Sequence, residues 1–503
     1  MANDVSGPPL LFLGDFPILA AVLAFLVVAL GLGLRLLALG VIPENRRPSS
    51  GMAWLILILV QPVIGFTIFL LFGTTSVGKT RTQRQSSALE RVREHTKSLH
   101  APDLPATAPA YLPSVLHLNR QLGAFPAVEA HGITLYPDYD ESLAAMTAAV
   151  EAAQHWVHVA FYITAWDETT NAFFTALAAA RKRGVTVRLL FDHIGSRGLS
   201  GYDEMLEKLD AADIDWHPML PFEILKRNIR RPDLRNHRKI LVIDGLVGFA
   251  GSQNMIEPGY HKEKNHKMGR KWVELTSRIE GALVSALDAV FATDWYTETG
   301  ELLEGEVIPA DPPPPYHGPD AVLGQVIPSG PGVVAENNLR AFTTLLYGAT
   351  RRISLTSPYF VPDESLLYAV TTAAERGVDV ELFVGEAGDQ FMVHHAQRSF
   401  YRALLEAGVK IYLYPAPLVL HSKHFSVDDD VVVLGSSIMD MRSFALNYEI
   451  SVMFVGDAVM RRMREVEDGY RAVSRLLTLE EWEQRPWRQR YVDNVMRLTA
   501  ALQ

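Results

Sequence analysis

Two long apolar runs dominate the first 75 residues of the chain. The first begins at Pro17 and reaches Ile42 with a single charge, Arg35, and the second is uncharged from Met52 to Phe72. Each run is long enough to cross a hydrocarbon core that needs about 20 residues. The pattern predicts a membrane region, residues 1–75, with two transmembrane helices at about residues 17–42 and 52–73.

The alternatives for these runs are a cleaved signal peptide and a buried hairpin of a soluble domain. Asp4 and Asp15, rather than basic residues, precede the first run, and the two runs stand in tandem. Both observations favour two membrane spans.

Basic residues are concentrated after the second run. They are Lys79, Arg81, Arg84, Arg91, Arg93 and Lys97, while the loop between the runs holds Arg46 and Arg47 and none precedes the first run. Basic residues near span ends stay on the cytoplasmic side. We therefore expect a multi-pass protein of the cell (inner or plasma) membrane, with the chain after residue 75 in the cytoplasm. The basic cluster suits contact with anionic headgroups, and a solvated linker helix is the alternative.

Prolines divide the rest of the chain. Four prolines between Pro102 and Pro113 mark a basic linker, residues 76–113, and the run from Pro312 to Pro315 separates two segments of similar length. We expect these segments, residues 114–310 and 318–503, to be two lobes.

The two segments repeat one order of elements. The first has strands at residues 156–163 and 185–191 around a helix at about 171–183, and the second has strands at 352–356 and 378–384 around a helix at about 364–376. Alternating strands and helices predict an α/β fold with a mostly parallel, covered sheet in each lobe. A duplication of this type predicts a pseudo-twofold pair of lobes with a site between them.

Composition narrows the possible chemistry. With 48% hydrophobic residues among 503, the chain can build large cores. It has no cysteine, which excludes disulfides, thiolate metal sites, iron–sulfur clusters and a cysteine nucleophile. The net charge of −10 argues against nucleic acid as a partner of the molecule as a whole.

A histidine and a lysine two residues apart occur in both lobes. The first block is His237, Lys239, Asp244 and Ser252, and the second, at identical spacing, is His421, Lys423, Asp428 and Ser436. Residues i and i+2 of a strand share a face, so each block points an imidazole and an ammonium into one space. A lysine can bind a phosphate oxygen, and an imidazole can attack phosphorus or transfer a proton. One copy is typical of a surface pair, whereas two copies indicate a site for a phosphodiester.

Carboxylates accompany each block. Asp244 precedes Gly245 where a hairpin turn is expected, and Asp428 has the matching place, so both are expected to fix local geometry rather than to touch substrate. Glu274 and Glu449 occupy similar places downstream, where each could accept a hydrogen bond from a catalytic imidazole and select its tautomer. An ordinary strand glutamate is the alternative.

The blocks resemble the signature of the phospholipase D superfamily, His-x-Lys-x4-Asp-x6-Gly-x-x-Asn in two copies, and Asn254 completes the first copy. The chain is similar, more closely, to the bacterial cardiolipin synthases. That likeness rests on the apolar runs, on Arg47-Pro48-Ser49-Ser50 ahead of Trp54, and on Asp440-Met441-Arg442-Ser443-Phe444 followed by Asn447-Tyr448-Glu449. It covers nearly the whole chain.

The resemblance implies a phosphatidyltransferase that joins two phosphatidylglycerol molecules into cardiolipin and glycerol through a phosphohistidine. His237 is then the nucleophile, and His421 is the acid and base. The implied catalytic set is His237, Lys239, Asp244, His421, Lys423 and Asp428, supported by Asn254, Ser252, Ser436, Glu274 and Glu449. The resemblance implies no metal and no other cofactor. Its partners are phosphatidylglycerol, other anionic phospholipids and the bilayer, and not nucleic acid.

One position departs from the signature. The second copy has Ile438 where the family has asparagine, and isoleucine can neither donate nor accept a hydrogen bond. A membrane-bound phospholipase D that hydrolyses lipid to phosphatidic acid is the alternative enzyme, because water and an alcohol compete for the same phosphohistidine. A catalytically weak membrane scaffold has only Ile438 in its favour.

Basic residues flank the first block on both sides. They are Lys226, Arg227, Arg230, Arg231 and Arg235 before it and Lys262, Lys264, Lys267, Arg270 and Lys271 after it. Against an acidic background they predict positive charge beside the site, as attraction of an anionic headgroup requires.

Overall fold

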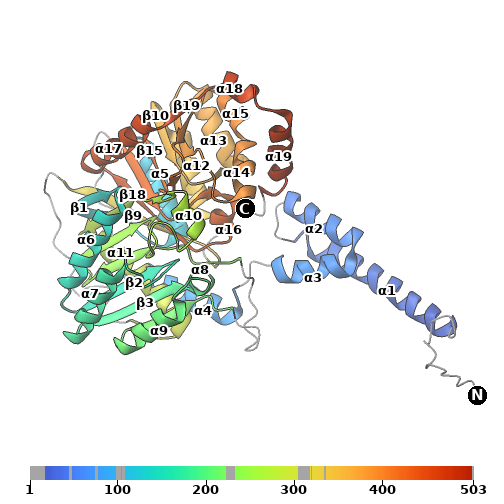
Figure 1. Cartoon of the computed structure of the whole chain (residues 1–503), viewed down its shortest axis with the longest axis horizontal. Coiled ribbons are helices and arrows are strands. Elements are labelled where there is room, and N and C mark those ends of the chain that lie inside the picture. The colour runs from blue at the N-terminus through green and yellow to red at the C-terminus, as the bar shows by residue number, and fades with distance from the viewer. Residues whose placement is uncertain are drawn as a thin grey trace, which may run out of the picture. The chain divides into compact units, whose positions relative to one another are not determined.

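The chain folds into two compact units, Met1–Thr75 and Ser76–Gln503 (Figure 1). The computed structural model describes residues 17–44, 48–73, 77–97, 104, 108–222, 231, 233–303, 318, 320–332 and 336–500. In the first unit the helices are α1 (Pro17–Val41), α2 (Pro48–Val60) and α3 (Pro62–Phe72). A small core of Ala38, Ile42, Leu55, Ile58 and Phe69 packs them together.

The second apolar run is not one continuous helix. Among the described residues, only α1 is both long and apolar enough to cross a membrane. The helix predicted at residues 52–73 is divided at Gln61, because Pro62 has no N–H for the helical ladder and its ring clashes with the preceding turn. Arg35 of α1 donates from Nε to the carbonyl of Leu59 (3.1 Å), close to this break. A pair of transmembrane helices is therefore not confirmed.

One sheet of 15 strands runs through the second unit in the order β19-β13-β12-β10-β15-β16-β18-β9-β1-β8-β6-β5-β2-β3-β4. The first lobe supplies β1 (Val128–Tyr136), β2 (Trp156–Phe161), β3 (Thr186–Asp192), β4 (Asp215–Met219), β5 (Ile240–Ile243), β6 (Val247–Gly251) and β8 (Thr276–Glu280). The second lobe supplies β9 (Val322–Ser329), β10 (Arg352–Thr356), β12 (Asp379–Gly385), β13 (Lys410–Tyr414), β15 (His424–Val427), β16 (Val431–Gly435), β18 (Glu449–Val455) and β19 (Arg475–Leu477). Outward from the β1–β9 pair, the two lobes repeat the same succession of strands, as a duplication requires, and the second lobe adds β19 at its edge.

The sheet is mixed, and the expectation of mostly parallel sheets was wrong. Only β2–β3–β4 and β10–β12–β13, the units built from strand, helix and strand, are parallel. The remaining pairs are antiparallel, because each lobe adds a hairpin, β5–β6 or β15–β16, that tight turns connect. The α/β class and the duplication are as expected.

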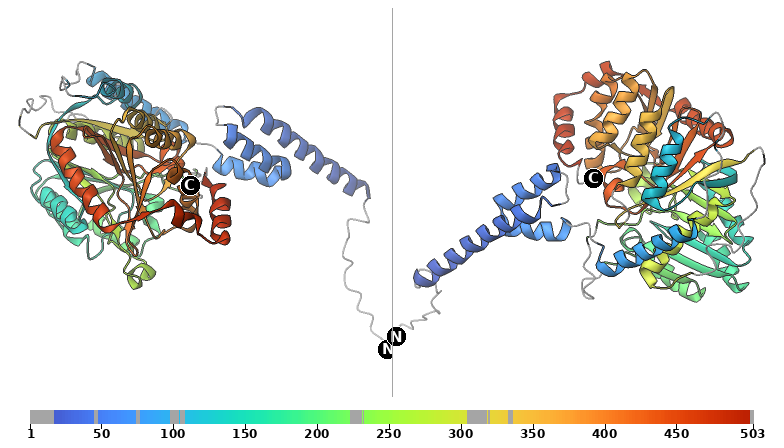
Figure 2. Two further views of the ribbon diagram at one scale, coloured as in Figure 1. Left: turned by 90° about the horizontal axis from the view of Figure 1, so that it is seen from above. Right: turned by 180° about the vertical axis from the view of Figure 1, so that it is seen from behind.

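Helices cover both faces of the sheet (Figure 2). On one face, α11 (Leu283–Thr299) and α17 (Asp457–Val473) cover a core that both lobes share. On the other face each lobe has its own core: α6 (Tyr139–Glu151), α7 (Asn171–Lys182) and α9 (Tyr202–Ala211) cover the first. The second is covered by α5 (Leu112–Gly123), α12 (Asn337–Gly348), α13 (Glu364–Glu375), α14 (Phe391–Arg398) and α15 (Tyr401–Glu406). The lobes are thus one continuous body, joined through a sheet and a core.

The segment expected to be a linker contains a packed helix. Within residues 76–113, α4 (Lys79–His95) lies against α11, and its Arg81 is buried in an ion pair with Glu298. Arg84 donates to the carbonyl of Thr297 (3.3 Å). These two basic residues therefore hold α4 to the body, and the basic cluster is neither a wholly solvated face nor wholly free to contact headgroups.

Candidate active site

The two His-Lys pairs lie directly before the first residues of two corresponding strands, β5 and β15. His237 and Lys239 directly precede β5, and His421 and Lys423 lie between the short strand β14 (Val419–Leu420) and β15. In both lobes the lysine Nζ donates to the carbonyl of its own histidine, at 2.6 Å. The two half-sites therefore share one local geometry.

Each histidine meets a glutamate of the other lobe. His421 Nδ1 lies 2.7 Å from Glu274 Oε1 of the first lobe, and His237 Nδ1 lies 3.2 Å from Glu449 Oε1 of the second. Both carboxylates are buried, at 2% and 0% exposure, whereas the side chains of His421 and His237 keep 15% and 17%. Each lobe thus supplies the glutamate that lies beside the histidine of the other lobe, and we call this arrangement the exchange of carboxylates. Both imidazoles remain accessible to solvent.

Short backbone pairings between the lobes produce this exchange. The strand β7 (Trp272–Val273) pairs with β14, and the N–H of His421 donates to the carbonyl of Val273 (2.8 Å). In the matching place, Asn236 bridges to Tyr448, and the N–H of His237 donates to the Tyr448 carbonyl (2.8 Å). In each case the carbonyl belongs to the residue just before the glutamate, so the pairing sets the carboxylate beside the imidazole.

Serines complete both half-sites. Ser252 Oγ donates to Glu274 Oε2 (2.6 Å), and Ser436 Oγ donates to Glu449 Oε2 (2.5 Å). Each serine Oγ also accepts the backbone N–H of the residue after its glutamate, at 2.9 Å. Serine, glutamate and the opposite lobe's histidine therefore form a fixed chain of polar contacts.

The charges of the two half-sites act on one another. Burial lowers the pKa of Lys239 to about 8 and that of Lys423 to about 7. The negative charges of Glu274 and Glu449 both act on each lysine in the opposite direction and raise its pKa. Burial also lowers the pKa of His237 and of His421, against the opposing charge of the glutamates. Each imidazole also lies beside a carboxylate of the other lobe, so the blocks form one candidate site, in which a neutral imidazole is favoured near pH 7.

The two half-sites differ at the asparagine position. Asn254 accepts from the N–H of Ile163 (3.3 Å) and donates to Tyr260 Oη (2.8 Å), whose hydroxyl lies 3.4 Å from Glu274 Oε1. Ile438 instead packs in the core of the second lobe at 8% exposure. The contact of Tyr260 with Glu274, and the hydrogen bond from Asn254 that holds Tyr260, therefore occur in the first copy, and Ile438 cannot provide an equivalent in the second.

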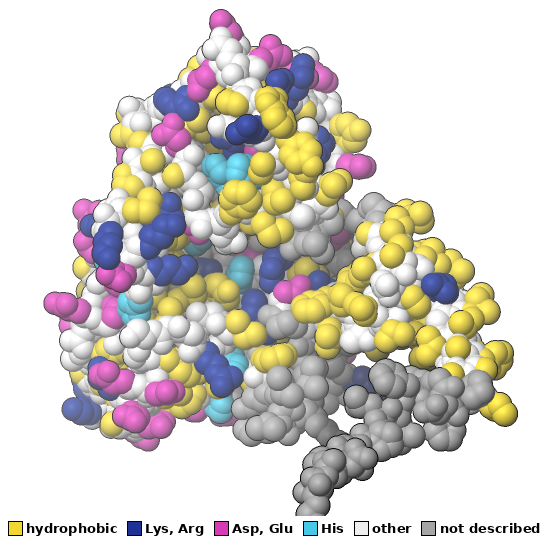
Figure 3. All heavy atoms as spheres, turned by 45° about the vertical axis from the view of Figure 1, so that its right-hand side comes forward, with side chains coloured by type: hydrophobic (Ala, Val, Ile, Leu, Met, Phe, Trp, Pro, Cys, Tyr) yellow, Lys and Arg dark blue, Asp and Glu magenta, His cyan; other side chains and the backbone are white. Residues whose placement is uncertain are grey.

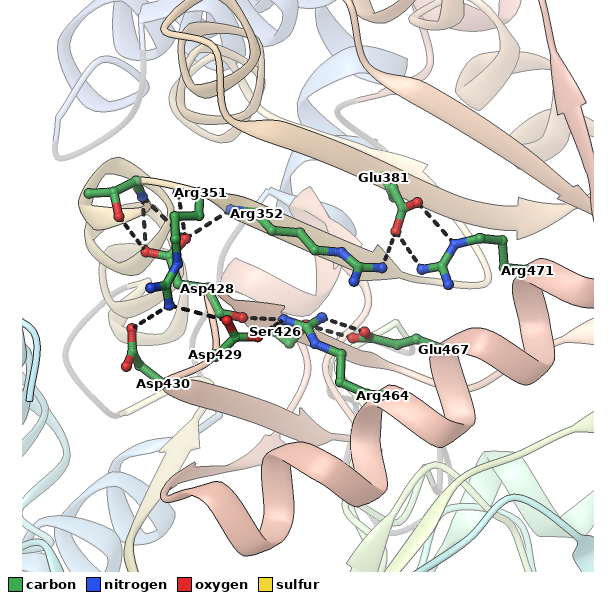
Figure 4. Close-up of polar contacts among 11 residues, drawn as sticks. Arg351, Arg352, Glu381, Ser426, Asp428, Asp429, Asp430, Arg464, Glu467 and Arg471 are labelled. Atoms are coloured by element: carbon green, nitrogen blue, oxygen red, sulfur yellow. Dashed lines mark hydrogen bonds and ion pairs between the residues drawn. The ribbon is translucent and has the colours of Figure 1, made fainter. Parts of the chain in front are cut away.

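The two aspartates lie away from the histidines, at the far ends of β5 and β15. Each lies seven positions after its histidine, at a rise of roughly 3.3 Å per position along a strand. Asp244 accepts the N–H groups of Gln154, His155 and Trp156, each at 2.8 Å. Asp428 accepts those of Thr350, Arg351 and Arg352 at 2.7 to 3.3 Å (Figure 4). Their contacts are those of residues that fix local geometry, and the structure does not bring them to the imidazoles.

Replacing Asp428 by alanine is expected to lower the free energy of unfolding by at least about 2 kcal/mol, because it leaves three backbone donors without their acceptor. Asp429, which is exposed and pairs with Arg351 and Arg464 on the surface (Figure 4), is the matched control. Asp429→Ala is expected to change stability by less than about 1 kcal/mol. Thermal unfolding of the full chain in detergent measures both, and equal shifts for the two variants would contradict the assignment.

Two residues near His237 were not foreseen from the sequence. The ring of Tyr162 lies 4.2 Å from the His237 ring, and Lys239 Nζ lies 5.4 Å from the Tyr162 centroid. Asn447 Nδ2 lies 3.3 Å from His237 Nδ1. Asn447 falls in the Asn-Tyr-Glu segment, but nothing in its spacing showed which histidine it would meet. Tyr162 follows β2 without any motif.

The body is hollowed on one face, and lysine, arginine and histidine side chains gather in the hollow (Figure 3). Arg235 does not supply free charge there, because it is buried against Asp192 (3.2 Å). Arg231 likewise pairs with Asp233 (2.6 Å). Lys226, Arg227 and Arg230 lie outside the described residues. Lys262, Lys264 and Lys267 are exposed at α10 (Glu263–Lys267), where Lys267 pairs with Glu263 (2.6 Å), and their place beside the site stays a prediction.

Among the described residues, no group of three or more His, Asp or Glu side chains has the arrangement of a metal site. The adjacent pair His394 and His395 belongs to helix packing, since His395 Nδ1 contacts Asp493 (2.6 Å).

Known proteins share both the sequence and the fold. The family model described as "Cardiolipin synthase, PLD-like domain" matches residues 146–295 and 342–468. Cardiolipin synthase A of Yersinia pseudotuberculosis (serotype O:1b, strain IP 31758) is 35% identical over 457 residues, which is 89% of this chain and 92% of that protein. The chain belongs to the cardiolipin synthase family. Cardiolipin synthase A of Yersinia pestis (bv. Antiqua, strain Angola) matches to the same extent.

A solved structure supports the fold independently. Phosphatidylserine synthase of Haemophilus influenzae Rd KW20 superposes with a TM-score of 0.57 over 77% of this chain and 97% of that chain, at 14% identity. This likeness shows the fold alone, whereas the family model and the relatives confirm the predicted membership of the phospholipase D-like cardiolipin synthases.

Proposed function

We propose that this protein is a cardiolipin synthase that transfers a phosphatidyl group from one phosphatidylglycerol to another and releases glycerol. One observation carries the proposal: two His-Lys half-sites, each completed by a glutamate of the other lobe, occur in a member of the cardiolipin synthase family. Two imidazoles that flank one binding space for an anionic phosphate suit a reaction with two successive displacements at phosphorus.

In the first step, His237 Nε2 attacks the phosphorus of the first phosphatidylglycerol. The N–P bond forms as the bond from phosphorus to the glycerol oxygen breaks, and His421 gives its proton to that oxygen. The arriving phosphate is negative, which favours the protonated form of His421 and offsets the effect of burial. Lys239 and Lys423 bind the nonbridging oxygens.

In the second step, a hydroxyl group of the second phosphatidylglycerol gives its proton to His421 and attacks phosphorus. The N–P bond breaks, His237 leaves as neutral imidazole, and cardiolipin is released. Glu274 and Glu449 orient the two rings through Nδ1, which leaves Nε2 to react. All protons remain within the pair of histidines and the two alcohols.

The helix α1 is proposed to anchor the enzyme in the cell membrane, with the catalytic body on the cytoplasmic side. Its length and apolarity support an anchor, and the basic residues after residue 75 support this orientation.

The fall of kcat/KM at high pH is expected to follow the deprotonation of Lys423 and Lys239. Because the pKa values of Lys423 and Lys239 are lowered to about 7 and about 8, kcat/KM should fall as pH rises through this range, since neutral lysine no longer attracts the phosphate. Lys423→Arg keeps the charge, so the basic limb should move up toward about pH 8. Lys410, on the surface with Asp379, is the control: Lys410→Arg should leave the limb in place. An unmoved limb in Lys423→Arg would contradict the assignment.

The proposal is tested by giving the purified full chain vesicles that contain phosphatidylglycerol alone, without added metal or nucleotide. Mass spectrometry of the lipids is expected to show cardiolipin together with released glycerol in equal amounts. Phosphatidic acid without cardiolipin would identify water as the acceptor and refute the synthase, while no turnover at all would refute an enzyme.

A further inference from the structure

The outer face of α19 (Trp487–Arg497) carries a row of exposed apolar side chains. Trp487, Tyr491 and Val495 are 66%, 64% and 36% exposed, and Leu498, directly after the helix, is 84% exposed. Their spacing of three and four residues places them along one side of the helix. Large apolar side chains aligned on successive turns mark a surface that contacts something other than water.

Arginines border this row, and no exposed acid interrupts it. Arg488 lies on one side and Arg490 and Arg497 on the other by the helical period, and all three are exposed. The single acidic residue of α19, Asp493, is 1% exposed and faces inward. A helix with aromatic and aliphatic residues on one side and arginines at its borders is typical of helices that lie in the interface of an anionic bilayer.

The inward side of α19 is held firmly to the body. Asp493 is contacted by His395 Nδ1 at 2.6 Å and by Arg485 Nη1 at 2.5 Å. Arg485 in turn stacks on Trp482 at 3.0 Å from the ring centroid. These contacts fix the rotation of the helix, so the apolar row is presented outward by a rigid element.

Neighbouring residues extend the surface. Phe391 and Met392 at the start of α14, which packs against α19, are 64% and 45% exposed. In Figure 1, α14 and α19 lie at the right of the body, and Figure 3 brings that side forward and shows hydrophobic side chains beside the hollow. The apolar surface and the hollow thus open on one side of the catalytic body.

We propose that α19 is a second membrane contact: Trp487, Tyr491, Val495 and Leu498 enter the interface of a bilayer rich in anionic phospholipid, and the bordering arginines bind its phosphates. This contact goes beyond the proposed function, and depends on it only in that the bilayer holds the substrate. With α19 in the interface, the hollow faces the surface of the bilayer.

Site-directed spin labelling tests the contact without relying on activity. Because the chain has no cysteine, Tyr491→Cys, Val495→Cys and, as a matched control, Glu483→Cys on the exposed side of α18 (Leu479–Glu483) each give one labelled site. The full chain is reconstituted into vesicles of phosphatidylcholine with phosphatidylglycerol. Labels at 491 and 495 are expected to gain accessibility to oxygen and lose accessibility to a nickel chelate, relative to 483.

Equal accessibility at all three sites would overturn the proposal. Spin–spin broadening at 491 and 495 that disappears on dilution with unlabelled chain would also overturn it, because the row would then be an interface between two copies.

Charge is tested with the Arg488→Gln, Arg490→Gln, Arg497→Gln triple variant. It is expected to lose the difference in accessibility between vesicles with and without phosphatidylglycerol, whereas Arg181→Gln, at a partly exposed arginine of the first lobe that pairs with Asp213, should keep it. If the triple variant behaves like the parent, the arginines do not bind the phosphates of the bilayer, and that part of the proposal is wrong.

Discussion

Replacing His237 or His421 by alanine is expected to lower phosphatidyl transfer from phosphatidylglycerol by at least about 10⁴-fold, because each ring carries one part of both displacements. Both side chains are only partly exposed and are placed by backbone pairings that do not involve the imidazoles. The variants should therefore fold, with thermal unfolding close to that of the parent, and cardiolipin formation measures the loss.

A lipid with an activated leaving group separates the two histidines. A phosphatidyl ester of p-nitrophenol expels an anion that needs no proton, so His421→Ala should still release one equivalent of p-nitrophenol in a burst. His237→Ala should release none. The reverse pattern would make His421 the nucleophile, and loss of the burst in both variants would exclude a covalent step on one histidine alone.

Replacing Glu274 or Glu449 by glutamine is expected to lower kcat by about 10- to 100-fold, because the partner imidazole loses its oriented carboxylate. The effects should cross between the lobes. Glu449→Gln, in the second lobe, should slow the burst that depends on His237, whereas Glu274→Gln, in the first lobe, should spare the burst and slow cardiolipin formation through His421. Stopped-flow measurement of the burst beside steady-state turnover separates the two.

Glu381 supplies the control for the glutamates. It is also a buried strand glutamate, but it is held by Arg352 and Arg471 away from the histidines (Figure 4). Glu381→Gln should lower thermal stability and leave kcat unchanged. If Glu274→Gln impaired the burst and Glu449→Gln did not, each glutamate would serve its own lobe, contrary to the geometry.

The sequence predicted the residue types of the candidate site but not which glutamate contacts which histidine. The identical spacing of the two His-Lys blocks predicted the same local geometry in both lobes, and both show it, although the residues lie just before β5 and β15 rather than on a strand. Glu274 and Glu449 were expected near an imidazole. Which imidazole each would meet depends on β7–β14 and on the Asn236–Tyr448 bridge, and pairings this short have no periodicity to detect.

Similar reasons explain the errors in the fold. Helix and strand order predicted the duplication, yet the hairpins β5–β6 and β15–β16 make most of the sheet antiparallel. Hydropathy predicted one long helix at residues 52–73, although Pro62 breaks it. Arg81 was assigned to a linker because a charge pattern does not show that Glu298 will bury it.

The exchange of carboxylates has a consequence for the growing chain. His421 follows Glu274 by 147 residues, so the first lobe leaves the ribosome with a carboxylate whose imidazole has not yet been made. Until the second lobe exists, the partners of Glu274 are the hydroxyls of Ser252 and Tyr260 in its own lobe, and no imidazole lies beside it. A polypeptide that ends before residue 421 therefore contains only one of the two histidines, and we expect it to form no cardiolipin.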